Sequence, residues 1–450
     1  MATMRARVAP GTQEDRFAAY MNSLAQAAEH VDREEPLKAY CKGLLLPGER
    51  KSVEPMAARL APDNVRQMHQ SLHHVVADSP WDDELMLSRV RQSVLPAMEK
   101  NGAIEAWIVD DTGFAKKGTH SVGVARQYCG QLGKQDNCRV AVSLSIATAT
   151  SSLPVAWRLY LPEVWTKDKK RRKKTGIPSD IGFETKVQIA LKQIEKAVEN
   201  GIPVAPVLAD AAYGNDSQFR SKITQLGLRY IVGVQSSTTV WKPGEAPLKK
   251  KTWKGQGRPT TLLRRDKTHQ PVSVKQLAVS VPAKAWHNVT WREGSQENLR
   301  SRFGAVRIRP AHRDTWRSEP HPEEWLLIEW PDGDAEPSKY WLSTLPANFS
   351  LKQLVYRAKH RWIIERDYQE LKQELGLGHY EGRGWRGFHH HATLCIAAYG
   401  FLVAERNRFS PSAAVGNLEL SLPKLPKKFR PRGSRPSRAP QSTLDRNAAY

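Results

Sequence analysis

The sequence predicts an α/β protein that carries a helical N-terminal domain and a β-rich insertion. Before residue 100, apolar residues recur every three or four positions, which is the period of an amphipathic helix. From residue 104, short β-rich runs alternate with helical segments, as they do in layered α/β folds. Residues 241–345 interrupt this alternation with runs in which apolar residues alternate with Arg, Lys and Trp.

The charge balance points to a polyanionic partner. The 450 residues contain 69 Lys and Arg against 46 Asp and Glu, which gives a formal net charge of +23. Such an excess attracts nucleic acid through phosphate neutralisation and counterion release. Ribosomal, membrane-surface and heparin-binding proteins share a basic balance, so charge alone leaves these classes open. The hydrophobic content of 40% is sufficient for real cores and excludes a disordered chain.

The apolar runs and the cysteines indicate the compartment. No apolar run approaches the roughly 20 residues needed to span a bilayer, and the N-terminus "MATMRARVAPGTQEDRF" lacks a hydrophobic signal region. The four cysteines show no CxxC spacing, so we expect reduced thiols rather than disulfides or a zinc finger. We therefore expect a soluble cytoplasmic protein without a membrane partner.

The first half of the chain divides into two expected domains. Residues 1–100 should form a helical domain, because "EDRFAAYMNSLAQAAEHV" and "DNVRQMHQSLHHVVADS" keep the helical period. This domain could bind DNA, or its helices could simply pack on the core. Residues 101–240 should form the first part of the α/β core, with the order β, β, β, α, β, α, β.

The second half should complete the core and end in a tail. Residues 241–345 are the expected β-rich insertion, and residues 346–408 should supply the C-terminal helices of the core. Residues 409–450 should be a basic, Pro-rich disordered tail, because residues 421–440 contain seven basic residues, five prolines and no acid. Such a tail would contact phosphates nonspecifically or maintain solubility.

Carboxylates follow two of the predicted strands. "AWIVDD" places Asp110 or Asp111 where a buried strand meets a loop, and "VAPVLAD" ends in the same way at Asp210. Carboxylates next to buried strands are costly unless cations pair with them. The simpler interpretation for Asp210 is that its side chain caps the next helix. Two such strand ends in one sheet favour a functional site.

A third carboxylate lies on the predicted helix "KHRWIIERDYQELKQELGLGHYEGR" at residues 359–383. Steps of four and seven residues advance about 40° and about −20° around a helix, so Arg361, Glu365 and Lys372 form one polar row. An apolar row on a neighbouring face consists of Ile364, Leu371 and Leu375. Packing the apolar row on the sheet would bring the polar row to its edge. Alternatively, Arg361 and Glu365 are an ordinary surface pair.

Together, Asp110 or Asp111, Asp210 and Glu365 would form a site for hard divalent cations. Carboxylate oxygens suit Mg²⁺ or Mn²⁺, and two such ions about 4 Å apart can activate a water or 3′-hydroxyl in phosphodiester transfer. Arg361 and Lys372 could then hold the flanking phosphates of DNA.

These residues resemble the motifs of DDE-type insertion-sequence transposases with an RNase H-like catalytic domain. In the group marked by a Tyr, Arg, Glu, Lys signature, Arg, Glu and Lys have the spacing of Arg361, Glu365 and Lys372. "VLADAAYG" is similar to the motif of the second Asp, and "VDDTG" is similar to that of the first. The resemblance selects Asp110 over Asp111 and implies an RNase H-like core. The signature tyrosine departs from the pattern, because Tyr356 lies five rather than three positions before the arginine.

The resemblance implies a function on double-stranded DNA. It implies cleavage at the terminal inverted repeats of a transposon, joining of the freed 3′-hydroxyls to target DNA, and a homodimer that holds both ends near the bacterial nucleoid. It also implies that the β-rich insertion helps to hold these ends. Two alternatives remain: a catalytically inactive, transposase-derived DNA-binding protein, and a nuclease or resolvase that uses the same core.

Three further segments have expected roles. "KDKKRRKKTG" at 167–176 is an expected basic loop, in which Lys169, Lys170, Arg171 and Arg172 would track DNA near the site or remain solvated. "GVARQYCGQLGKQDN", at 123–137, should shape the site rather than bind nucleotide. The consecutive histidines 389–391 point to different sides of a helix, so we expect no shared metal ion.

Overall fold

The N-terminal part of the chain is helical, as the sequence predicts. The computed structural model describes residues 11–256, 258, 260–293 and 298–409, so nearly all of the expected tail lies outside the described residues. The helices of this part are α1 (Gln13–Ala25), α2 (Val31–Leu45), α3 (Val53–Leu60), α4 (Val65–His73) and α5 (Asp83–Asn101), joined by the short turns η1 (Gln26–Ala28), η2 (Pro62–Asn64) and η3 (His74–Asp78). Polar caps start several of them. Thr12 and Asp15 form a capping box at α1, and Asp82 accepts backbone N–H bonds at α5.

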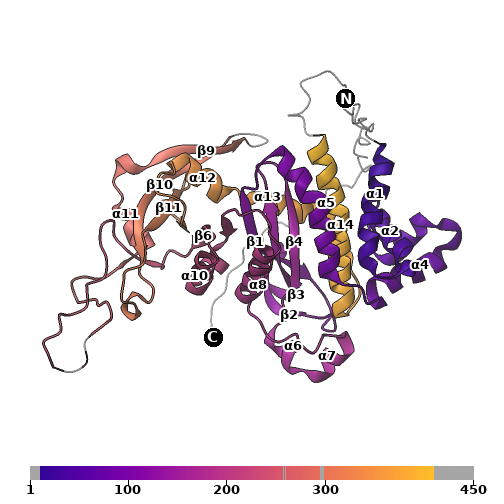
Figure 1. Ribbon diagram of the computed structural model, residues 1–450, viewed down its shortest axis with the longest axis horizontal. Helices are drawn as coiled ribbons and strands as arrows, with labels where there is room; N and C mark the ends of the chain where they lie inside the picture. The colour runs from indigo at the N-terminus through magenta and orange to yellow at the C-terminus, as the bar shows by residue number, and fades with distance from the viewer. Residues whose placement is uncertain (1–10, 257, 259, 294–297, 410–450) are drawn as a thin grey trace, which may run out of the picture. The chain divides into compact units, whose positions relative to one another are not determined.

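These helices pack against the long C-terminal helix α14 (Trp385–Arg408), which lies beside α5 (Figure 1). The Tyr20 hydroxyl donates to the carbonyl of Ala397 at 2.8 Å. Gly400 of α14 faces Tyr20, Val90 and Val94 so closely that a Cβ there would crowd all three. This glycine therefore permits the close approach of α1 and α5. Among the described residues, no helix is long and apolar enough to cross a membrane.

The core sheet combines antiparallel strands around β3 with a parallel part. Its strands are β1 (Ala106–Ala115), β2 (Ala125–Cys129), β3 (Lys134–Ala147), β4 (Ser152–Leu159), β5 (Val207–Ala209) and β6 (Tyr230–Val234), with the turn η4 (Gly130–Leu132) after β2. β3 pairs with β1 on one side and with β2 and β4 on the other. β1, β5 and β6 run parallel. The α/β class with an RNase H-like core is thereby confirmed.

Helices cover both faces of this sheet, which explains why its strands are continuous apolar runs. α8 (Lys186–Glu199) leads into β5, and α10 (Ser217–Gln225) connects β5 to β6 after the short α9 (Ala211–Gly214). Because such crossovers are right-handed, α8 and α10 lie on the same face, and the two helices contact each other (Figure 1). α13 (Trp362–Gln373) lies on the opposite face, where the Tyr368 and Ser143 hydroxyls are 2.7 Å apart. The turn η7 (Leu377–His379) follows it.

The insertion continues the same sheet instead of forming a separate one. Its elements are β7 (Thr239–Trp241), β8 (Val272–Ser273), α11 (Val274–Ser280), η5 (Ala283–Ala285), β9 (His287–Glu293), β10 (Asn298–Pro310), η6 (Asp314–Trp316), β11 (Glu324–Trp330) and β12 (Lys339–Ser343). β12 pairs with β6 and extends the sheet in the order β6-β12-β11-β10-β7-β8. At the end of α12 (Leu351–Lys359), the Lys359 ammonium bonds to the buried Glu329 at 2.6 Å, which holds the insertion against the core helices.

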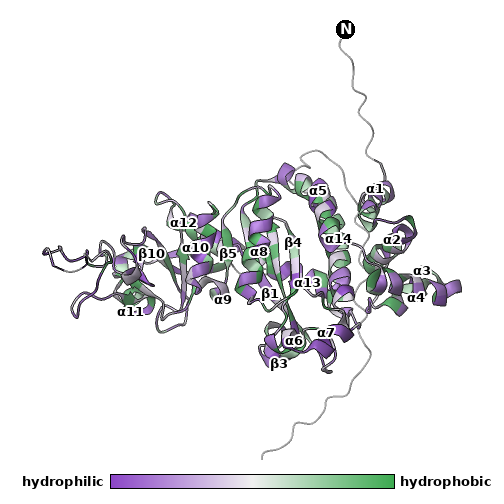
Figure 2. Cartoon of the chain, turned by 60° about the horizontal axis from the view of Figure 1, so that its bottom comes forward, coloured by the Kyte–Doolittle hydropathy of each residue, from purple (hydrophilic) through white to green (hydrophobic). Residues whose placement is uncertain are grey.

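Two expectations about local structure were wrong, and one strand was not predicted. The basic segment 167–176 is not a loop, because most of it forms the helix α7 (Lys169–Thr175), which follows α6 (Glu163–Lys167) and is capped by Asp168. The segment 123–137 contains the strand β2, which pairs with β3. The segment 272–282 reads as a strand by alternation but is mainly α11, because Ser273 and Gln276 form a capping box there. α7 is strongly hydrophilic (Figure 2). The four cysteines are free thiols, and all four are buried.

A buried carboxylate fixes α13 between the sheet and α14. Asp367 is 1% exposed and accepts hydrogen bonds from the Ser152 hydroxyl at 2.6 Å and the Tyr399 hydroxyl at 2.8 Å. Burial raises the pKa of Asp367 to about 6, although both hydroxyls oppose this shift. The helix that carries Glu365 is therefore held by a polar contact as well as by its apolar face.

Asp367 should make the stability of the fold depend on pH. Because its pKa in the folded protein lies above the ordinary value of 3.8, its favourable contribution is present below that value and is lost as pH rises through about 6. Between about pH 5 and pH 7.5, the parent should lose about 1 kcal/mol of unfolding free energy relative to Asp367→Asn. Urea unfolding of both proteins at several pH values measures this difference, and parallel pH profiles would contradict it.

Candidate active site

The Asp-Asp pair at 110–111 divides its side chains between the two faces of the sheet. Successive residues of a strand point to opposite faces. Asp110 faces α13, where its Oδ2 accepts a bond from Nη1 of Arg361 at 2.7 Å. Asp111 faces α8 and α9, where its Oδ2 lies 3.0 Å from Nζ of Lys186 and 3.3 Å from the Tyr213 hydroxyl. The two acids therefore belong to different environments.

The sheet register brings Asp210 beside Asp110. β1 and β5 are parallel neighbours in which Trp107 pairs with Val207 and Ile108 with Leu208, so the same register places Asp110 next to Asp210. Asp210 also caps α9 by accepting the backbone N–H of Ala212 at 2.9 Å. The simpler interpretation of Asp210 as a cap is therefore correct, and it does not exclude a place in the site.

A glycine allows α9 to approach the sheet directly after Asp210. A Cβ on Gly214 would collide with the carbonyl oxygen of Gly233 in β6. Tyr213, one residue earlier, is 1% exposed and directs its hydroxyl to Asp111. The aromatic residue and the glycine of "ADAAYG" thus have structural roles around the second acid.

α13 carries the third acid with the predicted orientation. Ile364, Leu371 and Leu375 are buried at 0 to 2% exposure, which confirms the apolar row. Arg361 is the N-cap residue of the helix, and its Nη2 lies 3.9 Å from Oε1 of Glu365, whose side chain is 69% exposed. The predicted helix from 359 is broken, because α12 ends at Lys359 and α13 begins at Trp362.

The guanidinium of Arg361 lies among the three carboxylates. Burial opposes its charge, but Asp110, Asp210 and Glu365 together raise the pKa of Arg361. Burial raises the pKa of Asp110 to about 6; Arg361 opposes this rise, and the nearby charge of Asp210 adds to it. The carboxylates of the site therefore repel one another, and a bound cation lowers this repulsion.

The side chain of Lys372 is engaged within the protein, whereas the sequence suggested that it would be available to hold a phosphate. Its Nζ donates to the carbonyl of Gly113 in β1 at 2.8 Å and lies 4.9 Å from the centre of the Phe114 ring. Burial lowers the pKa of Lys372. The lysine thus fastens α13 to the end of the strand that carries Asp110, a partner that helical spacing could not reveal.

The donor set suits a hard divalent cation. Mg²⁺ and Mn²⁺ prefer carboxylate oxygens, which Asp110, Asp210 and Glu365 all supply. In the part of the chain that the structure describes, no three ligating side chains already converge on one point. The Arg361 guanidinium instead contacts Asp110 and Glu365. The residues therefore fit such an ion by their chemistry, and Glu365 is exposed enough to turn.

The basic helix α7 presents two kinds of cation. Lys169 and Lys170 are exposed. The guanidinium of Arg172 donates to the carbonyls of Ile181 and Pro178, each at 2.7 Å, and Arg171 lies 4.9 Å above the Trp165 ring. The two arginines therefore stabilise the conformation of this segment, and the two exposed lysines can contact a polyanion such as DNA.

Each histidine of 389–391 has its own partners. His389 accepts from the backbone N–H of Leu159 at 3.2 Å, His390 lies 3.0 Å from the carbonyl of Trp81, and His391 lies 2.9 Å from the Tyr40 hydroxyl. Burial lowers the pKa of His389 to about 3 and of His390 and His391 to about 4. They join α14 to its neighbours as neutral side chains.

Sequence reasoning missed two side chains beside the acids. Lys186, the first residue of α8, holds Asp111, and Asp367 positions α13. Lys186 gives no signal of its own in the sequence, because its partner is 75 residues away. Tyr356, near the expected position of the signature tyrosine, bonds to Glu105 at 3.1 Å.

Asp110 lies within β1 rather than where that strand meets a loop, Asp210 directly follows the adjacent β5, and Glu365 lies on the flanking helix α13 of an RNase H-like fold. Residues 21–298, more than half of the chain, match the family described as DDE superfamily endonuclease. The chain belongs to this superfamily. The match includes Asp110 and Asp210 and ends before α13.

A segment of 190 residues is 33% identical to the probable transposase for insertion sequence element IS701 of Microchaete diplosiphon. That segment covers 42% of this chain and 46% of the relative. The similarity therefore extends over less than half the length of either protein.

Proposed function

We propose that the protein is the transposase of an insertion sequence, which cuts transposon ends and joins their 3′-hydroxyls to target DNA. The observation that carries this proposal is the placement of Asp110, Asp210 and Glu365 around Arg361 in an RNase H-like core. Membership of the endonuclease superfamily and the likeness to a probable transposase support it.

The carboxylates would hold two Mg²⁺ or Mn²⁺ ions. When bound, such ions activate the attacking oxygen and stabilise the leaving oxygen of a phosphodiester. Asp110 and Asp210 are fixed by the sheet register, so they would define the position of the scissile phosphate. Glu365 is exposed and would turn inward from α13. Asp110 must be ionised to serve as a ligand, which favours function above about pH 6.

The cations near the site would hold double-stranded DNA. Arg361 would turn from Asp110 to a flanking phosphate, and Lys372 would keep β1 and α13 in register. Lys169 and Lys170 would contact the backbone, with Arg171 and Arg172 keeping α7 in shape. These phosphate contacts position the duplex without reading its sequence.

The wider organisation follows from this chemistry. Joining two transposon ends to one target requires both ends in one complex, which favours a homodimer on DNA. Residues 1–100 would form a DNA-binding helical domain, and residues 101–240 and 346–408 would form the catalytic core. Residues 241–345 would be the insertion that holds the transposon ends, and residues 409–450 would be a basic tail. A protein that acts on bacterial DNA would work in the cytoplasm at the nucleoid.

The three acids should each be essential for cleavage. Alanine at Asp110, Asp210 or Glu365 should lower cleavage of DNA carrying the element's ends by more than about 100-fold in Mg²⁺. The reason is that mutating even the residues that hydrogen-bond to metal ligands typically lowers metal affinity or activity by about 10- to 100-fold. End binding should remain largely intact, since phosphate contacts carry the affinity. Parallel cleavage and gel-shift assays measure the two effects.

Asp111→Ala is the matched control, because it changes the adjacent acid on the other face. It breaks the part-exposed pair with Lys186 and leaves the buried Tyr213 hydroxyl without its acceptor, so it should cost about 1 to 3 kcal/mol of stability while cleavage continues. An inactive Asp111→Ala beside an active Asp110→Ala would place the site on the α8 face. End binding without cleavage by the parent would identify an inactive DNA-binding protein, and cleavage without joining would identify a nuclease or resolvase.

The exposed lysines of α7 should contribute to DNA affinity. Replacing Lys169 and Lys170 by Ala should weaken duplex binding and reduce the slope of log K against log salt by about 2, because each phosphate contact contributes about one. Arg172→Ala should instead lower the melting temperature, since the backbone carbonyls of residues 178 and 181 lose their donor. Unchanged affinity and slope in the lysine variant would make α7 a solvated helix.

A further inference from the structure

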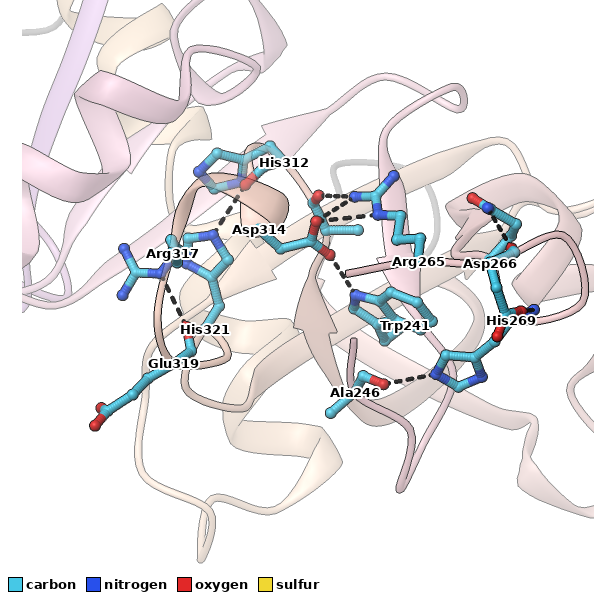
Figure 3. Close-up of polar contacts among 12 residues, drawn as sticks. Trp241, Ala246, Arg265, Asp266, His269, His312, Asp314, Arg317, Glu319 and His321 are labelled. Atoms are coloured by element: carbon cyan, nitrogen blue, oxygen red, sulfur yellow. Dashed lines mark hydrogen bonds and ion pairs between the residues drawn. The ribbon is translucent and has the colours of Figure 1, made fainter. Parts of the chain in front are cut away.

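The loop between β10 and β11 is anchored by a fully buried carboxylate. Asp314 is 0% exposed. It accepts hydrogen bonds from Nε1 of Trp241 at 2.7 Å and from Nε and Nη2 of Arg265 at 3.0 and 2.7 Å (Figure 3). Charge-assisted bonds to a buried acid fix a loop in one conformation. The turn η6 starts at this residue and is therefore held rigidly.

Two histidines close the base of the same loop. Nε2 of His321 lies 2.9 Å from the carbonyl oxygen of His312, and their rings are 4.5 Å apart (Figure 3). Nδ1 of His312 lies 3.3 Å from Nη2 of Arg220, which is 4% exposed. Burial lowers the pKa of His312 to about 3 and lowers that of His321, so both rings are neutral at physiological pH.

This rigid loop presents one tryptophan and two arginines. Trp316 is 70% exposed, although it is among the largest apolar side chains of the molecule. The Arg313 guanidinium lies 5.2 Å from the centre of the Trp316 ring, and Arg313 adopts a φ of 49°, which L residues rarely adopt. Arg317 follows directly. The loop thus maintains an unfavourable backbone conformation while exposing an aromatic ring beside cations.

The loop forms one wall of a groove of about 490 Å³. The other wall is α10, which contributes Ser217, Ser221 and Lys222. The lining includes the cations of Arg313, Arg317 and Lys222 and no carboxylate. Lys222 is itself paired with Glu195 at 2.9 Å, so the two arginines are the main source of positive charge. The groove therefore suits a polyanion with an aromatic component.

The groove is separate from the candidate active site. α10 lies with α8 on the face of the sheet toward which Asp111 points, while Asp110, Arg361 and Glu365 lie on the α13 face. A nucleic acid in this groove would therefore not be the strand at the carboxylates. The groove is a second binding surface of the same chain.

We propose that this groove binds an unpaired segment of a DNA strand, with a base stacked on Trp316 and the adjoining phosphates held by Arg313 and Arg317. Aromatic side chains in basic grooves bind single strands because every base has a free face for stacking. A duplex covers those faces, so it could use the arginines but not the indole. The proposal goes beyond the proposed function, because it requires neither metal nor cleavage.

Oligonucleotide binding in EDTA tests the groove. Fluorescence anisotropy of a labelled oligothymidylate should show about 5- to 100-fold weaker binding by Trp316→Ala, the usual effect of losing one base stack. Trp316→Phe should retain most of the affinity. Binding of a labelled duplex of the same length should change little. Because Trp316 is largely exposed, the melting temperature should remain that of the parent.

Trp253→Ala is the matched control, because Trp253 is 54% exposed and also lies in a basic segment, but outside the groove. Its single-strand affinity should equal that of the parent. Equal losses in the two tryptophan variants, equal losses on duplex, or no loss in Trp316→Ala would each overturn the proposal. Asp110→Ala should bind the oligothymidylate normally, so failure of the proposed catalysis would be seen separately.

Discussion

The ion pair between Arg361 and Asp110 is the contact on which the arrangement of the candidate site depends. Asp110 lies in the middle of the buried strand β1 beside Asp210, and two carboxylates in that position repel each other and lose hydration. The guanidinium at 2.7 Å makes this position tolerable, and it comes from the first residue of α13. The ion pair therefore ties the start of the helix that carries Glu365 to the two acids of the sheet. Asp367 then determines how that helix lies on the sheet.

Asp110 and Asp111 are adjacent in β1, but their side chains take part in different interactions on the two faces of the sheet. On the α13 face, Asp110 meets Arg361 in the candidate site. On the other face, Asp111 is neutralised by Lys186, and α8 and α10 lead to the groove beside Trp316. Because β12 joins the insertion to β6 in one continuous sheet, this groove is built on the same rigid frame as the acids. With DNA at both proposed sites, one chain would position two DNA segments relative to each other.

Local patterns predicted the elements whose burial is simple. The apolar row of Ile364, Leu371 and Leu375 was predictable because one face of α13 is buried. Asp110 and Asp210 were predictable because each follows an apolar run, although β1 continues through Asp110 to Ala115. Alternation failed at residues 272–282, where a capping box favours α11. The sequence could not show that Lys372 bonds to Gly113 or that Arg172 donates to backbone carbonyls of its own segment. It also could not show that the insertion continues the core sheet. These contacts join residues far apart in the chain or depend on side-chain direction.

The most direct test of the central claim is the affinity of the site for Mn²⁺, measured by isothermal titration with the parent and with Glu365→Gln. Glutamine keeps the shape of the side chain and removes its charge, and the exposed position of Glu365 leaves the fold unaffected. If α13 brings this acid to Asp110 and Asp210, the variant should bind Mn²⁺ at least about 10-fold more weakly. Equal affinity in the two proteins would show that Glu365 is not part of the site.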